Sequence, residues 1–263
     1  MAGYSNQKVF ILYEDEHLLV VKKPFGMESQ RGKSFAMDQE SLLRGYLSSK
    51  TKTDNPYLAV VHRLDRPVAG VMVYAKTKKA AADLSAQLQT ENFSKKYEAV
   101  VSGIVPACEG RLEDYLTADK RTGTTSVSSK ADPLAKKAVL TWKEIAREEV
   151  KSGEILLPYA INPSPEGGWH FLSIVLETGR HHQIRAQLSH AGMPIAADVR
   201  YGGAKVHGPR GAIALCAAQL SFRHPITGKY LTFSWNDDTN ITAVNGRRSD
   251  ITAVRLIVEE IRL

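Results

Sequence analysis

Cysteine is scarce in this chain of 263 residues, which contains only Cys108 and Cys216, in no CxxC arrangement. This scarcity excludes a disulfide framework and a zinc site of four thiolates. Long apolar runs are also missing, because none approaches the roughly 18 residues that would span a bilayer. The first residues lack the charged-then-apolar pattern of a secretory signal. We therefore expect a soluble, cytoplasmic protein with no membrane partner.

Several familiar catalytic motifs are absent as well. The chain has no GxxxxGK[ST] loop, no GxGxxG after a strand and no GxSxG elbow, which favours a site that needs no cofactor. The residues His181, His182, His190 and Asp198 are close in sequence. However, adjacent histidines point about 100° apart on a helix, and there is no HExxH. We therefore expect no metal site.

Positive charge is in excess, with 35 Lys and Arg against 28 Asp and Glu, a formal net charge of +7 and a pI of about 9.3. With 43% hydrophobic residues the chain can form a proper core. Excess positive charge favours encounter with phosphate backbones, although many basic proteins never bind nucleic acid.

Local patterning predicts strands that follow one another more often than they alternate with helices. The predicted strands cover residues 9–13, 18–22, 58–61, 71–75, 95–102, 138–145, 169–177, 211–222 and 230–235. Helices are predicted over 39–49 with Asp38 as N-cap, over 78–89 with Thr77 as N-cap, and over about 180–191 before Gly192. Residues 117–136 indicate an exposed hairpin or loop, and the tail from residue 250 fits a strand or a helix. This order favours an α+β fold around a mostly antiparallel or mixed sheet.

The segment VVHRLDRPVAGVMVYAK, residues 60–76, is the first candidate for chemistry. An apolar strand leads into a loop with Asp65 between Arg63 and Arg66. Two neighbouring arginines should keep a carboxylate ionised, which suits a nucleophile or general base. On charge pattern alone, a surface salt-bridge cluster at a strand end is the alternative.

Two further segments supply candidate side chains. In residues 177–192 the apolar stripe of Ile184 and Leu188 would be buried, and His182 or Arg185 could reach a pocket at its edge. In residues 94–103, Tyr97 could project from a strand into a cleft. A tyrosine buried in the core with a bonded hydroxyl is the alternative for Tyr97.

Taken together, the segments resemble the RluA family of RNA pseudouridine synthases. The motifs that carry the resemblance are, in order, VFILYEDEHLLVVKKPFGM at 9–27, HRLD at 62–65, KKYEA at 95–99, GRHHQIR at 179–185, Asp198 with Tyr201-Gly202-Gly203, and LSFRHPITGK at 220–229. The resemblance runs from about residue 8 to residue 235. It implies one catalytic domain over 1–263, with a core of about 8–235, a C-terminal extension of 236–263 and no separate N-terminal RNA-binding domain.

The resemblance implies the pseudouridine-synthase α+β fold, a mixed and mainly antiparallel sheet with flanking helices and a central active-site cleft. It also implies isomerisation of specific uridines in rRNA or tRNA by a monomer, without cofactor or metal. The catalytic carboxylate is then Asp65, with Tyr97 and Arg185 as active-site partners. The residues expected to bind the RNA substrate are His62, Arg63, Arg66, Arg180 and His182.

The reaction suits these residue types. Isomerisation breaks the N1–C1′ bond, rotates the base and joins C5 to C1′, with no redox step. An ionised Asp65 could attack C1′ or remove a proton to give a glycal. Arg185 would keep Asp65 charged, and Tyr97 could stack on uracil and help remove the C5 proton. The target base must leave its stack, while basic residues hold the flanking backbone.

One departure from the family pattern follows HRLD. Many members have Thr-Ser-Gly where this chain has Val68-Ala69-Gly70, which removes two hydroxyls beside the nucleophile. Two other hypotheses are kept. A catalytically silent RNA-binding protein on the same fold would be unaffected by Asp65→Asn, and a metal-dependent nuclease would lose activity with a chelator. Residues 117–137 are expected to contribute to RNA binding.

Overall fold

The computed structural model describes residues 10–32, 38–160, 168–206, 208, 211–237 and 242–244. The tail from residue 250, and most of the expected 236–263 extension, lies outside this range. The chain divides into two compact units, which we describe separately: unit 1 is residues 1–95 with 217–263, and unit 2 is residues 96–216. That both units belong to one catalytic domain stays a prediction.

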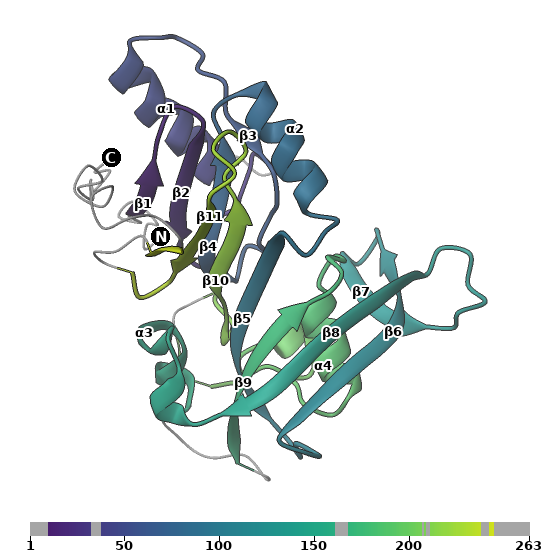
Figure 1. Ribbon diagram of the computed structural model, residues 1–263. Helices are drawn as coiled ribbons and strands as arrows, with labels where there is room; N and C mark the ends of the chain where they lie inside the picture. The colour runs from purple at the N-terminus through teal and green to yellow at the C-terminus, as the bar shows by residue number, and fades with distance from the viewer. Residues whose placement is uncertain are drawn as a thin grey trace, which may run out of the picture. The chain divides into compact units, whose positions relative to one another are not determined.

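Unit 1 is a set of paired strands with two helices (Figure 1). Its strands are β1 (Phe10–Glu14), β2 (Leu18–Lys23), β3 (Ala59–Val60), β4 (Ala69–Ala75), most of β10 (Leu215–Arg223), β11 (Tyr230–Ser234) and β12 (Thr242–Val244). In the sheet β2 lies between β1 and β4, β10 follows β4, and β11 lies between β10 and β12. The pairs β1–β2, β2–β4, β3–β4, β10–β11 and β11–β12 are antiparallel.

The two helices of unit 1 start where the sequence predicts. Helix α1 (Gln39–Thr51) is capped by Asp38, whose carboxylate accepts from the Ser41 N–H at 2.9 Å. Helix α2 (Lys78–Gln87) is capped by Thr77, whose hydroxyl accepts from the Ala80 N–H at 3.3 Å. Each cap satisfies a backbone donor that the first helical turn leaves without a partner. Helix α2 ends at Gln87, two residues earlier than predicted.

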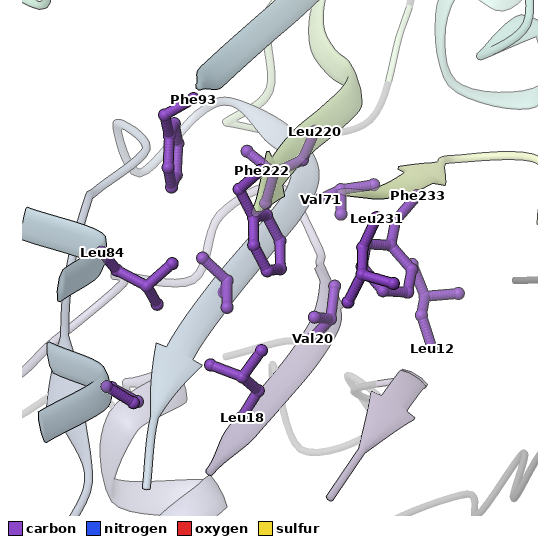
Figure 2. Close-up of a cluster of buried hydrophobic side chains, with 13 residues drawn as sticks. Leu12, Leu18, Val20, Val71, Leu84, Phe93, Leu220, Phe222, Leu231 and Phe233 are labelled. Atoms are coloured by element: carbon purple, nitrogen blue, oxygen red, sulfur yellow. The ribbon is translucent and has the colours of Figure 1, made fainter. Parts of the chain in front are cut away.

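The main core of unit 1 lies between α2 and the strands β2, β4 and β10 (Figure 2). Leu84 of α2 and Phe222 of β10 are fully buried in it, and Phe93 stacks on Phe222 with ring centroids 5.9 Å apart. Fully burying such a side chain contributes about 1.5–3 kcal/mol. Truncating Leu84 to Ala would therefore cost about 2–5 kcal/mol, including the cavity it leaves.

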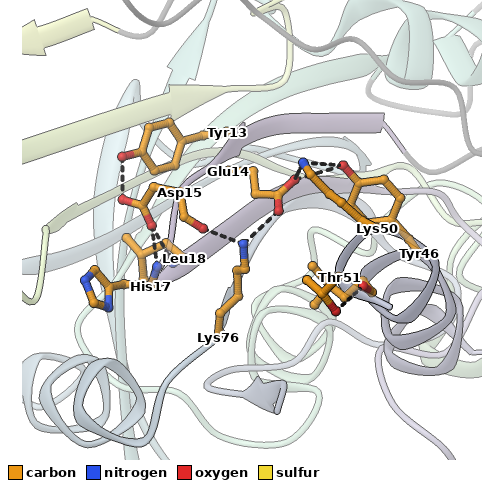
Figure 3. Close-up of polar contacts among 10 residues, drawn as sticks. Tyr13, Glu14, Asp15, His17, Leu18, Tyr46, Lys50, Thr51 and Lys76 are labelled. Atoms are coloured by element: carbon orange, nitrogen blue, oxygen red, sulfur yellow. Dashed lines mark hydrogen bonds and ion pairs between the residues drawn. The ribbon is translucent and has the colours of Figure 1, made fainter. Parts of the chain in front are cut away.

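A charged cluster fastens α1 to the first strand (Figure 3). The Glu14 carboxylate binds Lys50 Nζ at 2.8 Å and Lys76 Nζ at 2.7 Å. These cations, with the hydroxyl of Tyr46, lower the pKa of Glu14 against the opposing effect of its burial. The cluster joins the end of α1, the end of β1 and the residue after β4.

Unit 2 is an antiparallel sheet covered by one helix. Its strands are the main part of β5 (Phe93–Ser102), β6 (Glu109–Asp119), β7 (Thr124–Ser128), β8 (Lys136–Ile145) and β9 (Trp169–Leu176), in the order β5-β9-β8-β6-β7. Helix α4 (Gln183–His190) packs on β6 and β7, with Ala186 beside Leu116 and Ala138. A short helix, α3 (Gly153–Leu156), and the 3-10 turns Arg147–Glu149, Leu157–Ala160 and Val199–Tyr201 complete the unit.

The fold-class prediction is confirmed, one strand is added to the predicted elements, and two predicted starts are corrected. Strand β6 begins well before the expected hairpin of 117–136 and was not predicted, because its first half exposes Glu109, Arg111 and Glu113 and contains no apolar run. The helix predicted from Arg180 starts at Gln183, because His182 has a left-handed backbone with φ 50°. The strand predicted from residue 211 starts at Leu215. The expected hairpin is present, with β6 and β7 as its strands.

Candidate active site

Asp65 lies on the loop between β3 and β4 in unit 1. Its carbonyl accepts from the Val68 N–H at 3.0 Å, which closes a tight turn around Pro67. Along the loop, His62 and Leu64 are buried, while Asp65 is partly exposed and Arg63 and Arg66 are exposed. The three charged residues of this loop therefore lie outside the core of unit 1.

The segment 23–29 holds this loop through hydrogen bonds of Ser29 and Gly26. The Ser29 hydroxyl accepts from the Leu64 N–H at 3.1 Å and donates to the Leu64 carbonyl at 2.8 Å. Next to Asp65 on the other side, the Gly26 N–H donates to the Arg66 carbonyl at 2.7 Å, and Arg66 Nε donates to the Gly26 carbonyl at 2.9 Å. The residues on both sides of Asp65 are thus hydrogen-bonded to the segment that follows β2.

Lys23, at the end of β2, supports the same loop from within the core. Its side chain is fully buried, and its ammonium donates to the carbonyls of Val68 at 2.7 Å and Pro24 at 2.8 Å. Lys23 lies opposite Gly70 in the antiparallel pair of β2 and β4, which brings its ammonium close to the Val68 carbonyl. Sequence reasoning noted Lys-Pro with a following glycine but assigned no role to Lys23 or Ser29. This Lys-Pro motif was the feature of the sequence that could have pointed to their supporting role.

His62 faces the interior of unit 1. Its Nε2 accepts from the Val73 N–H at 3.2 Å, and its ring packs edge-on against Phe93 at 5.5 Å. Burial, and secondly the charge of Lys95, lowers the pKa of His62 to about 3. The imidazole is therefore neutral, with its proton on Nδ1. These contacts support the loop and differ from the substrate contact that the sequence suggests.

Tyr97 lies on β5 in unit 2, opposite Ile174 of β9, and is buried. The next side chain, Glu98, points to the other face of the sheet, since neighbours on a strand alternate. The Glu98 carboxylate accepts from the N–H of Ser152 at 2.8 Å and of Lys151 at 3.2 Å. Glu98 therefore anchors the start of α3, and Tyr97 faces away from it.

Arg185 is buried on α4. Its Nε donates to Asp198 Oδ2 at 2.6 Å and its Nη2 donates to Asp198 Oδ1 at 2.8 Å. The guanidinium carbon lies 4.7 Å from the centre of the Tyr201 ring. The expected pairing of Arg185 with Asp65 links residues of different units and stays a prediction.

The remaining predicted residues lie at the start of α4. His182 Nδ1 lies 2.8 Å from the Tyr201 hydroxyl, which also accepts from the Thr125 N–H at 2.8 Å. Arg180 is exposed, and its Nε donates to the Lys137 carbonyl at 2.9 Å. The structure thus brings His182 and Arg185 together around Tyr201. Asp198 and Tyr201 contact these two side chains, and sequence reasoning assigned no role to either, although both lie in the ordered motifs.

Two properties hold for the part of the chain that the structure describes. No three His, Cys, Asp or Glu side chains there are grouped to hold a metal ion. No helix there is long and apolar enough to cross a membrane.

Comparisons with known proteins show the family to which the chain belongs. The family model described as RNA pseudouridylate synthase matches residues 17–190. "tRNA pseudouridine synthase C" of Yersinia pestis is 30% identical over 235 residues, 86% of each chain. "Ribosomal large subunit pseudouridine synthase D" of Vibrio cholerae is 31% identical over 240 residues, 85% of this chain, which spans only 65% of that relative.

A solved structure has the same fold. "Human RNA Pseudouridylate Synthase Domain Containing 1" superposes with a TM-score of 0.63 over 95% of both chains, at 17% identity. The range matched by the family model contains all three of the motifs HRLD, KKYEA and GRHHQIR. The chain belongs to the RluA family of RNA pseudouridine synthases.

Proposed function

We propose that this chain isomerises specific uridines in tRNA or rRNA to pseudouridine, with Asp65 as the catalytic carboxylate. The observation that carries the proposal is the Asp65 loop. Its neighbours Leu64 and Arg66 are held by four hydrogen bonds to Ser29 and Gly26, and Lys23 binds the carbonyl of Val68, while Asp65 itself stays partly exposed. A surface salt-bridge cluster would need no such support, whereas a nucleophile must be held within a fraction of an ångström.

The three principal residues have distinct roles in the proposal. Asp65 attacks C1′ or removes a proton from the sugar, so that the N1–C1′ bond breaks. Arg185 keeps a carboxylate charged, and Tyr97 stacks on the detached uracil while it turns. Isomerisation is redox-neutral, so the proposal needs neither a cofactor nor a metal. Both units act together as one catalytic domain, in a monomer of the cytoplasm.

RNA binding is assigned to exposed basic side chains. Arg63, Arg66 and Arg180 are exposed and can reach phosphates. The β6–β7 hairpin adds Lys120 and Arg121 at its exposed turn. For His62 and His182, whose described contacts lie within the protein, we propose that they hold these elements in place.

The choice of RNA follows the relatives. The Yersinia pestis relative is named for tRNA and the Vibrio cholerae relative for the ribosomal large subunit. We therefore propose tRNA and large-subunit rRNA as the two substrates to compare.

The experiment measures tritium released to water from RNA labelled at C5 of uracil, because isomerisation must expel that hydrogen. Unmodified tRNA and large-subunit rRNA are separate arms. The protein should release tritium from at least one arm, and Asp65→Asn should release none while keeping its RNA affinity. Asp54→Asn, which changes an exposed carboxylate of unit 1, is the matched control and should behave as wild type. No release from either RNA would leave RNA binding as the function.

A further inference from the structure

Arg185 is held by the buried carboxylate of Asp198, which has no direct part in the proposed reaction. Arg185 and Asp198 are 5% and 1% exposed, and they share two hydrogen bonds of 2.6 and 2.8 Å. Asp198 comes thirteen residues after Arg185 and immediately before the 3-10 turn Val199–Tyr201. A buried pair of this kind adds little net stability in general, so we looked to another role for it.

The two hydrogen bonds to Asp198 determine which edge of the Arg185 guanidinium points away from Asp198. A guanidinium has five N–H donors in one plane. Asp198 occupies Nε and one N–H of Nη2, which together form one edge. The edge formed by Nη1 and the second N–H of Nη2 is therefore directed away from Asp198. A bidentate contact fixes rotation in the plane, which a single charge contact would not.

Tyr201 fixes the remaining freedom of the guanidinium plane. Its ring centre lies 4.7 Å from the guanidinium carbon of Arg185. The ring itself is held at its hydroxyl, which accepts from the Thr125 N–H at 2.8 Å and lies 2.8 Å from His182 Nδ1. The arginine thus has a carboxylate at one edge and an anchored aromatic ring on one face.

The backbone around Asp198 leaves little room for adjustment. The Asp198 carbonyl accepts from the N–H groups of Tyr201 and Gly203, both at 2.9 Å. A Cβ at Gly203 would meet the Ile195 carbonyl oxygen and the Asp198 nitrogen, so only glycine fits there. Ala197 has φ 64°, a left-handed conformation that costs a non-glycine residue energy. Such strain at the residue before Asp198 points to a geometry that the site needs.

We infer that Asp198 is the positioning residue of Arg185: with the Tyr201 ring as a second support, it holds the guanidinium in the one orientation in which Arg185 acts in the proposed reaction. This inference rests on the proposed function. Asp198 is 1% exposed and its carboxylate binds Arg185, so in this inference it acts through Arg185.

The test compares single-turnover rates of tritium release with RNA affinity. Asp198→Asn keeps the shape but loses the charge and one acceptor. We expect its rate to fall about tenfold or more, because small displacements of a catalytic group are costly. RNA affinity should change less than about threefold, since phosphate contacts dominate RNA binding. Asp114→Asn is the matched control: Asp114 accepts from Gln187 of the same helix at 2.7 Å without touching Arg185, and its rate should stay near wild type.

A double-mutant comparison separates positioning from a general structural role. In an Arg185→Lys background, Asp198→Asn should cause no further loss of rate, because the lysine has no fork to align. Equal losses in both backgrounds would overturn the inference. If Asp198→Asn does not fold, Asp198→Glu decides: its carboxylate is displaced by one methylene, and a folded variant with the wild-type rate would overturn the inference. Failure of the proposed function is distinct, because then the wild-type protein itself releases no tritium.

Discussion

Replacing Ser29 with alanine tests whether the segment 23–29 holds the catalytic loop. Ser29 is 4% exposed, and its hydroxyl is bonded to both the N–H and the carbonyl of Leu64, the residue before Asp65. Alanine would leave two buried main-chain groups without this partner, at about 1–3 kcal/mol each. We therefore expect the free energy of unfolding to fall by about 2–6 kcal/mol.

Ser221→Ala is the matched control within unit 1. Ser221 is also buried, but its hydroxyl binds the Thr232 hydroxyl at 2.9 Å, which can turn to another acceptor. Its loss should cost less than about 1 kcal/mol. Urea unfolding measures both variants, and native-state hydrogen exchange at the Leu64 amide reports the loop directly. Equal destabilisation by both variants, or unchanged protection of the Leu64 amide in Ser29→Ala, would refute the reasoning.

Two further predictions concern pH and salt. The His62 pKa of about 3 lies below the unfolded value of about 6.5, so protonation favours the unfolded state. The free energy of unfolding should fall as pH drops from about 6.5 toward 3, by roughly 3 kcal/mol at pH 4. In acid unfolding curves His62→Gln should be less sensitive to pH over this range. Parallel curves for the wild-type protein and the variant would count against a neutral, buried His62. For RNA binding, removing Lys120 and Arg121 together should reduce the slope of log affinity against log salt by about 1.5. Arg111→Ala should leave the slope unchanged, because Glu177 and Glu113 already bind Arg111, and an equal change in both variants would remove the hairpin from the RNA-binding surface.

Local features were predictable from the sequence because they depend on neighbouring residues. Asp38 and Thr77 cap their helices through N–H groups three residues on, and the loop after residues 58–61 carries Asp65 as its charge pattern indicates. The ordered motifs also identified the family correctly.

Only the tertiary structure decided which side chains hold the site together. Ser29 meets Leu64 across 35 residues, and Lys23 meets Val68 across 45 residues. Asp198 binds Arg185 of α4 next to a strained backbone, because Ala197 just before it has a left-handed conformation. Residue spacing along the chain does not encode these contacts, since the register of distant strands and the path of the loops set them. For the same reason His62, which the sequence offered as a substrate contact, lies inside the core of unit 1. The sequence by itself determined the family, the caps and the candidate nucleophile, whereas long-range packing determined how that nucleophile and its arginine are held.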